Sequence, residues 1–329
     1  MPIRILSHDD VHRCLPPGAC ADAMEQALAA LARGESSFPL RSVFRPDGSK
    51  GFLGLMPGFR GGDSPLYALK AVCIFPGNPA THGIDAHQGG VLLYSGETGE
   101  LTAVVDGAAL TSIRTAAVTA VATRALARPG SSDLAVLGAG SQARAHIIAL
   151  ADTLPLERVR VTSRTLAHAR ALVDELSPRF SFRLEAVELV GDAVRGADVV
   201  TTVSTAREPI LDADQLEPGM HVNLVGSSVA STREITGAGL ARTSLFVDRR
   251  ESTVNESGDY LMALREGAID DGHIRAELGE VLEGMAPGRT SPDEITCFKS
   301  LGVAIEDLAA AELAISIAER DEIGTVAPW

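Results

Sequence analysis

The chain has 329 residues and a formal net charge of −14, with 45% hydrophobic and 22% charged residues. This acidic balance disfavours nucleic acid as a partner, because phosphate binding needs a basic surface. No apolar run approaches the roughly 18 residues that cross a bilayer, and the first residues lack a secretory signal. We therefore expect a globular protein of the cytoplasm, with about two domains and no membrane contact.

The first predicted helix begins after Ser7, which has Asp10 three residues on, as in an N-terminal capping box. Within it, His8 and His12 are spaced to share a metal ion, but an exposed first turn is the favoured interpretation. The four cysteines are scattered without a CxxC pair, which predicts reduced thiols and no metal site. Residues 20–34 predict a second helix.

Residues 38–107 contain short apolar runs broken by Gly, Pro and Asp, which predicts the strands of a sheet. Lys70 lies within one of these runs, "LYALKAVCIF". A buried lysine costs several kcal/mol unless it is paired, and burial lowers its pKa. Lys70 is therefore either a lysine of an edge strand that blocks aggregation or a buried functional cation.

Residues 109–130 predict an Ala-rich helix that stops at Pro129-Gly130. With Thr111 as its N-cap, Arg114 falls in the first turn, where anions rather than cations are normally favoured. Arg114 with Thr115 beside it therefore looks arranged to hold a carboxylate or a phosphate. Three cations amid apolar neighbours together suggest a clamp for a carboxylate substrate, namely Arg41, Lys70 and Arg114.

From residue 133 onwards strands alternate with helices, which predicts a parallel, doubly wound sheet. Its first turn carries Gly138-x-Gly140-x-x-Ala143. The first Gly allows a tight turn, the second lets backbone approach a pyrophosphate, and the small third residue lets helix and strand pack closely. In this context the motif indicates dinucleotide binding rather than a merely structural turn.

The end of the second strand of this unit bears on which dinucleotide binds. An acid about 20 residues after the motif would hold the 2′-hydroxyl of NAD, but the chain has Ser163, Arg164 and Thr165 there. Arg164 suits a dianionic 2′-phosphate, which favours NADP, with NAD as the alternative. A solvated loop arginine is the other interpretation of Arg164.

The last segment, from Ser300 to Gly324, predicts a long helix with no strand after it. We expect this helix to return to the first domain. The predicted organisation is then a substrate-binding domain of residues 1–115 plus 302–329, with a dinucleotide-binding domain of residues 116–301 inserted.

Seven segments together resemble the ornithine cyclodeaminase/mu-crystallin family. They are "PLR" at 39–41, "LMPGF" at 55–59, "LKAVCIFPGNP" at 69–79, "HQGGVLLYSGETGEL" at 87–101, "LTSIRTAAVTAVATRALA" at 110–127, "GAGSQA" at 138–143 and "FKSLGVAIEDLAAA" at 298–311. The resemblance spans essentially the whole chain. It implies an α/β fold in which a Rossmann domain is inserted in an α+β domain that binds substrate and forms a homodimer.

The resemblance also implies roles for individual residues. Arg41, Lys70 and Arg114 would contact the substrate carboxylate, with Lys70 as the acid/base group. Met56, His87 and Ser228 would belong to the same site. The implied cofactor-binding residues are Thr115, Gly138, Gly140, Ser141, Gln142, Ala143, Ser163, Arg164, Thr165, Thr202, Val203, Ser204, Val225, Gly226, Ser227 and Gly302.

One departure from the family pattern is informative. Ser228, six residues before Glu234, stands where true ornithine cyclodeaminases have an Asp, and a serine hydroxyl is a poor base. The favoured activity is NAD(P)H-dependent reduction of a cyclic imino acid, Δ1-pyrroline-2-carboxylate or Δ1-piperideine-2-carboxylate, to L-proline or L-pipecolate. The alternatives are an ornithine cyclodeaminase or NAD-dependent alanine dehydrogenase, and an NADP-dependent ligand-binding protein of mu-crystallin type.

Overall fold

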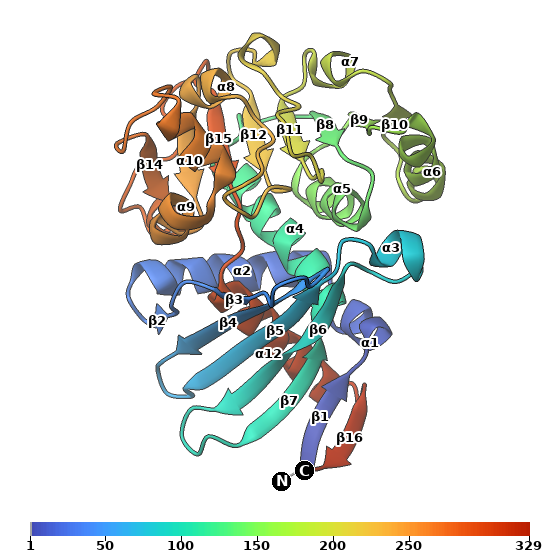
Figure 1. Ribbon diagram of the computed structural model, residues 1–329, viewed down its shortest axis with the longest axis vertical. Coiled ribbons are helices and arrows are strands. Elements are labelled where there is room, and N and C mark those ends of the chain that lie inside the picture. Colours follow the sequence, from blue (N-terminus) through green and yellow to red (C-terminus); the bar gives the residue numbers. More distant parts are fainter. Residues whose placement is uncertain (1) are drawn as a thin grey trace. The chain divides into compact units, whose positions relative to one another are not determined.

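The computed structural model describes residues 2–329, which form two compact units. One unit runs up to residue 114 and resumes at 303–329, and the other comprises residues 115–302. The first boundary falls inside helix α4 (Gly107–Leu126), so in chain order the second unit is inserted into the first (Figure 1).

The first unit is built on one mixed sheet, with strand order β16-β1-β7-β6-β5-β4-β2 and β3 paired to β4. The strands are β1 (Pro2–Leu6), β2 (Ser36–Ser37), β3 (Ser42–Phe44), β4 (Phe52–Arg60), β5 (Leu66–Ile74), β6 (His87–Ser95), β7 (Leu101–Asp106) and β16 (Thr325–Pro328). Its helices are α1 (His8–Cys14), α2 (Pro17–Ala32), α3 (Asn78–Thr81) and α12 (Ala304–Arg320). The Ser7 capping box predicted for α1 is confirmed.

Helix α12 packs on β4, β5 and β6 and against α2. Apart from Glu306 and Asp307, its buried residues are small or aliphatic, which lets the helix lie close to the sheet. At Gly58 on β4, an added Cβ would come within 3.3 Å of the Cβ of Ala304. This close packing brings the first turn of α12 against the centre of the sheet.

The predicted start of the Ala-rich helix is wrong. Helix α4 begins at Gly107, where the Asp106 side chain accepts a hydrogen bond from the Ala109 N–H (2.9 Å). Thr111 is inside the helix, and its hydroxyl donates to the Gly107 carbonyl (2.6 Å). Arg114 therefore lies about two turns from the N-terminus, beyond the first turn over which the helix dipole acts. Asp106, the last residue of β7, caps the helix earlier than the apolar pattern indicated.

The expectation that no strand follows the last helix is also wrong. Strand β16 comes after α12 and pairs antiparallel with β1, with Ile3 opposite Ala327. Both are short, and β16 lies at the edge of the sheet. Such a strand is stabilised by backbone hydrogen bonds to a neighbour distant in sequence, which a local pattern does not reveal.

The second unit is a Rossmann fold, as predicted. All eight strands are parallel, in the order β10-β9-β8-β11-β12-β15-β13-β14. The strands are β8 (Asp133–Leu137), β9 (Arg158–Thr162), β10 (Arg183–Ala186), β11 (Val199–Thr202), β12 (His221–Leu224), β13 (Ser244–Val247), β14 (Ile274–Glu277) and β15 (Thr296–Lys299). The order reverses between β8 and β11, and ligands of such sheets bind at that point.

Helices cover this sheet, whose strands are hydrophobic because both faces are buried. The helices are α5 (Ser141–Thr153), α6 (Leu166–Leu176), α7 (Val190–Val194), α8 (Gly237–Ala241), α9 (Arg250–Glu256), α10 (Gly258–Arg265) and α11 (Leu278–Leu282). Strands β10, β14 and β15, of four residues each, were not predicted. Across residues 2–329, no helix is long and apolar enough to cross a bilayer.

Candidate active site

Lys70 lies in the middle of β5, between β4 and β6, so it is not a lysine of an edge strand. Its cross-strand neighbours are Met56 on β4 and Val91 on β6. The side chain is 4% exposed and faces α12. The sequence left two interpretations of Lys70 open, and its burial favours a functional cation.

Two cations and two carboxylates meet around Lys70. Its Nζ lies 3.1 Å from Asp307 Oδ1, and the same oxygen accepts a hydrogen bond from Arg114 Nε (2.9 Å). Arg114 Nη1 also donates to Glu306 Oε2 (2.6 Å). All four side chains are buried, which is tolerable only because each charge is paired.

Lys70 has an unusual acidity for a lysine. Burial is the largest effect and lowers its pKa from 10.5 to about 8, with help from the nearby charges of Arg114 and Arg41. Asp307 acts in the opposite direction and stabilises the ammonium form. A group with a pKa near 8 can both give and take a proton close to neutral pH.

Two other predicted substrate contacts of this unit, Arg41 and His87, lie near enough to Lys70 for their charges to interact with it. Arg41, between β2 and β3, is near enough for its charge to act on Lys70. His87 begins β6, with 49% of its side chain exposed. Desolvation and the charges of Lys70 and Arg114 lower the pKa of His87 against the opposing effect of Asp85, so its neutral form is favoured.

Sequence reasoning missed the two carboxylates, Glu306 and Asp307. Both lie in the first turn of α12, where acids ordinarily balance the helix dipole. Because acids are ordinary at this position, they did not stand out in the sequence. Two adjacent acids in an otherwise Ala-rich, apolar helix could nevertheless have indicated a buried charged site. The structure shows them 0% and 1% exposed, directed at the cations.

The second unit contains a pocket of about 540 Å³ at the point where the strand order reverses. This volume lies in the range of small-molecule and cofactor sites. Seven predicted cofactor-binding residues line it: Gly138, Gly140, Ser163, Arg164, Thr165, Val203 and Ser204. The lining also includes side chains that were not predicted, namely Thr162, His168, Glu188, Val190, Thr205, Ala206 and Ile210.

The two glycines of the motif, Gly138 and Gly140, are needed for different reasons. Gly138 has a φ of 140°, and an added Cβ would lie 2.5 Å from the Val203 carbonyl oxygen, so this position accepts only glycine. At Gly140 an added Cβ would meet nothing within 4 Å, so the backbone is open towards the pocket. Helix α5 begins at the next residue and directs its N-terminal N–H groups to this place, as a pyrophosphate requires.

The remaining predicted cofactor-binding residues do not line the pocket. Ser141, Gln142 and Ala143 form the first turn of α5, just after the lining residue Gly140. The others that lie outside the lining are Thr115, Thr202, Val225, Gly226, Ser227 and Gly302. Ser228 belongs to the second unit, not to the one that contains Lys70. Throughout residues 2–329, no group of three or more His, Cys, Asp or Glu is arranged to hold a metal ion.

The chain is similar to known proteins over most of its length. A model of the ornithine cyclodeaminase/mu-crystallin family matches residues 4–321. The ketimine reductase mu-crystallin of Mus musculus is 39% identical over 293 residues, which are 88% of this chain and 89% of that protein.

Two solved structures are similar over their whole length. The Δ1-pyrroline-2-carboxylate reductase of Thermococcus litoralis, in complex with NADH and L-proline, has a TM-score of 0.94 at 33% identity, covering 98% of this chain and 99% of that one. An archaeal alanine dehydrogenase dimer with bound NAD has a TM-score of 0.93 at 29% identity, with complete coverage of both chains.

Proposed function

The chain belongs to the ornithine cyclodeaminase/mu-crystallin family, and from this we propose that it is an NAD(P)H-dependent imino-acid reductase. Its proposed substrates are small cyclic imino acids, Δ1-pyrroline-2-carboxylate or Δ1-piperideine-2-carboxylate, which become L-proline or L-pipecolate. The observation that carries the proposal is the buried Lys70, whose pKa is about 8. Similar proteins with ketimine reductase and pyrroline-2-carboxylate reductase activity support it.

In this proposal, each unit binds one of the two reactants. The first unit binds the imino acid, because Arg41 and Arg114 supply guanidinium groups whose planar N–H forks suit a carboxylate. The second unit binds the dinucleotide in the pocket beside Gly138 and Gly140. We propose these roles for the two units.

Reduction of the C=N bond needs a hydride at carbon and a proton at nitrogen. When bound, the reduced nicotinamide supplies the hydride. The Lys70 ammonium supplies the proton to the imine nitrogen and regains one from water after the product leaves. Asp307 keeps that ammonium charged in its buried setting, and the apolar side chains of Met56 and Val91 limit access of water.

The proposal is tested by following the absorbance of NADPH and of NADH with Δ1-pyrroline-2-carboxylate. We expect rapid oxidation of the reduced cofactor and formation of L-proline. Alanine dehydrogenase is the second candidate, since a structure of that activity is similar over the whole chain. Oxidation of alanine with NAD but no imine reduction would favour it, and release of ammonia from ornithine would contradict both.

Arg164 and its neighbours Ser163 and Thr165 support NADP as the cofactor, because they line the pocket where the second strand ends. Replacing Arg164 by serine is expected to raise the KM for NADPH about tenfold or more, since a hydrogen bond to a charged group contributes about 1.5–3 kcal/mol. The KM for NADH should change little. Arg170→Ser, on the exposed surface of α6, is the matched control. An equal effect on both cofactors would exclude a contact to the 2′-phosphate.

Asp307 should set the pH at which the enzyme loses activity. With Lys70 as the proton donor, kcat/KM falls as pH rises through the Lys70 pKa, near 8. Asp307→Asn removes the charge that raises this pKa, so the alkaline limb should move to lower pH, by about 1 to 3 pH units. Glu312→Gln, on the same helix, pairs with Arg60 at the surface and should leave the profile unchanged. If Asp307→Asn lowered kcat/KM equally at every pH and left the alkaline limb in place, Asp307 would not control the pKa of Lys70.

We also propose a homodimer formed through the sheet face opposite α12. Tyr67 on β5 is 49% exposed, and its outward neighbours Leu69, Leu92 and Tyr94 are partly exposed apolar or aromatic side chains. The similar alanine dehydrogenase forms a dimer. Sedimentation equilibrium should give twice the mass of one chain, and a monomer at micromolar concentration would refute the proposal.

A further inference from the structure

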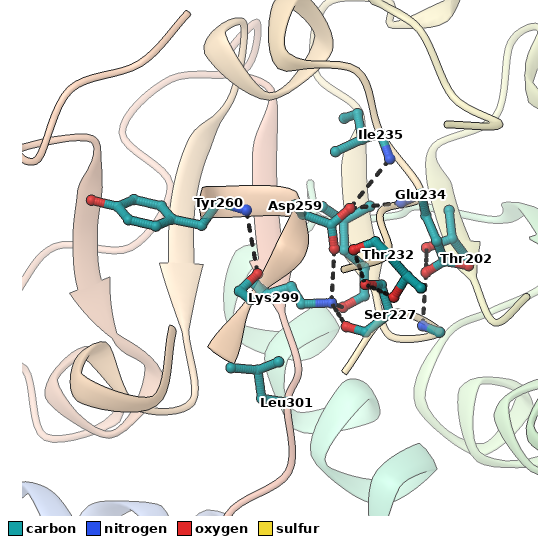
Figure 2. A network of polar contacts seen from close by, with 12 residues as sticks. Thr202, Ser227, Thr232, Glu234, Ile235, Asp259, Tyr260, Lys299 and Leu301 are labelled. Atoms are coloured by element: carbon teal, nitrogen blue, oxygen red, sulfur yellow. Dashed lines mark hydrogen bonds and ion pairs between the residues drawn. The ribbon is translucent and has the colours of Figure 1, made fainter. Parts of the chain in front are cut away.

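A buried polar network in the second unit centres on Glu234, which is 0% exposed (Figure 2). Its carboxylate accepts four hydrogen bonds, two on each oxygen. Oε1 accepts from the Ser204 N–H (2.8 Å) and the Ser204 hydroxyl (2.6 Å). Oε2 accepts from the Thr202 hydroxyl (2.6 Å) and the Gly226 N–H (2.7 Å). One side chain thus joins the segments that follow β11 and β12.

The first of these segments forms a wall of the dinucleotide pocket. Ser204 lines the pocket together with residues 203, 205 and 206. The second segment lies directly behind it, because a Cβ added at Gly226 would come within 2.2 Å of the Ser204 carbonyl oxygen. Glu234 therefore supports this wall from its buried side, without lining the pocket itself.

Two further buried charged residues, Asp259 and Lys299, hold Glu234 in place. Asp259 Oδ1 accepts hydrogen bonds from the Glu234 N–H (2.7 Å) and the Ile235 N–H (3.3 Å). Asp259 Oδ2 lies 3.0 Å from Lys299 Nζ, which also donates to the Ser227 carbonyl (2.5 Å). Lys299 and Asp259 are both 1% exposed, so this support is itself buried.

We infer that Glu234 is a positioning residue for the nicotinamide half of the cofactor. In a doubly wound sheet the first mononucleotide-binding half, here β8 to β10, takes the adenosine end. The half that begins at β11 takes the nicotinamide end, and Glu234 fixes its first two loops. This inference rests on the proposed function, because it assumes that the pocket binds a nicotinamide dinucleotide.

The isosteric variant Glu234→Gln tests this role sharply. Each carboxylate oxygen accepts from one hydroxyl and one backbone N–H. A hydroxyl can turn to accept from an amide NH₂ group, but a backbone N–H can only donate. In either orientation of the glutamine amide, one of the two N–H groups, that of Ser204 or of Gly226, faces the NH₂ group and loses its acceptor. The loop that carries this N–H must then move.

Calorimetric titration with two ligands separates positioning from folding. NADPH carries both the adenosine and the nicotinamide halves, whereas 2′,5′-ADP carries only the adenosine half. We expect Glu234→Gln to bind NADPH about 10- to 100-fold more weakly and 2′,5′-ADP within about twofold of wild type. NADH and ADP are the equivalent pair if the wild type prefers NAD. Glu266→Gln, which removes a surface carboxylate paired with Arg233, is the control and should change neither affinity.

Equal weakening of both ligands, or of neither, in the folded variant would overturn the inference. If Glu234→Gln does not fold, Thr202→Val removes one hydroxyl donor to the same carboxylate and should show the same difference between ligands at smaller size. A wild type that binds neither dinucleotide would instead refute the proposed function. The two failures are therefore distinguishable.

Discussion

Replacing Lys70 by methionine is expected to lower kcat/KM for imine reduction by about 10²- to 10⁴-fold, the usual contribution of a general acid. The fold should survive, because Asp307 keeps its hydrogen bond from Arg114 Nε when the lysine is removed. Methionine also matches the lysine stem in length and suits the apolar neighbours on β4 and β6. The loss should therefore be one of chemistry rather than of structure.

The measurement is kcat/KM with Δ1-pyrroline-2-carboxylate, together with the dissociation constant for NADPH. The variant should bind NADPH as the wild type does, because the dinucleotide pocket is lined by residues of the other unit. Lys50→Met removes an exposed lysine of the same unit and should leave both quantities unchanged. If Lys70→Met kept more than about a tenth of the wild-type activity, Lys70 would not be the proton donor.

Arg114→Met should lower the free energy of unfolding by about 3–5 kcal/mol, because it breaks buried ion pairs. Arg114 forms ion pairs with both Glu306 and Asp307, whereas Lys70 pairs with Asp307. Its removal leaves more negative than positive charge in a site that is almost closed to water. Removing Lys70 is milder, because the remaining Arg114 still contacts both carboxylates.

Urea unfolding followed by circular dichroism measures this loss. Arg60→Met is the matched control, because Arg60 pairs with Glu312 of the same helix at the surface, where the side chains are 30% and 40% exposed. An exposed pair contributes at most about 1 kcal/mol. Adding Glu306→Gln to Arg114→Met should restore part of the stability by removing one uncompensated charge. Equal losses of unfolding free energy in Arg114→Met and Arg60→Met would show that the buried ion pairs of Arg114 stabilise the fold no more than the exposed Arg60–Glu312 pair.

The sequence predicted some elements well and others poorly, for physical reasons. Gly138 and Gly140 indicated the turn beside the pocket, because a tight turn between a strand and a helix leaves a local signature in the sequence. The start of α4 was misplaced because Asp106 caps the helix from the end of a strand, ahead of the apolar pattern. Strand β16 was missed because its stability comes from its pairing with β1 at the other end of the chain.

The sequence by itself determined the Rossmann unit and the presence of cations in an apolar sheet. These features can be read from the periodicity and composition of short stretches of the chain. Only the tertiary structure decided what the cations do, because Asp307, which pairs with Lys70, lies 237 residues further along the chain. The same holds for Glu234, since no local pattern shows that one carboxylate holds two loops. Burial and long-range pairing set the charge and pKa of these groups, and both arise only when the chain has folded.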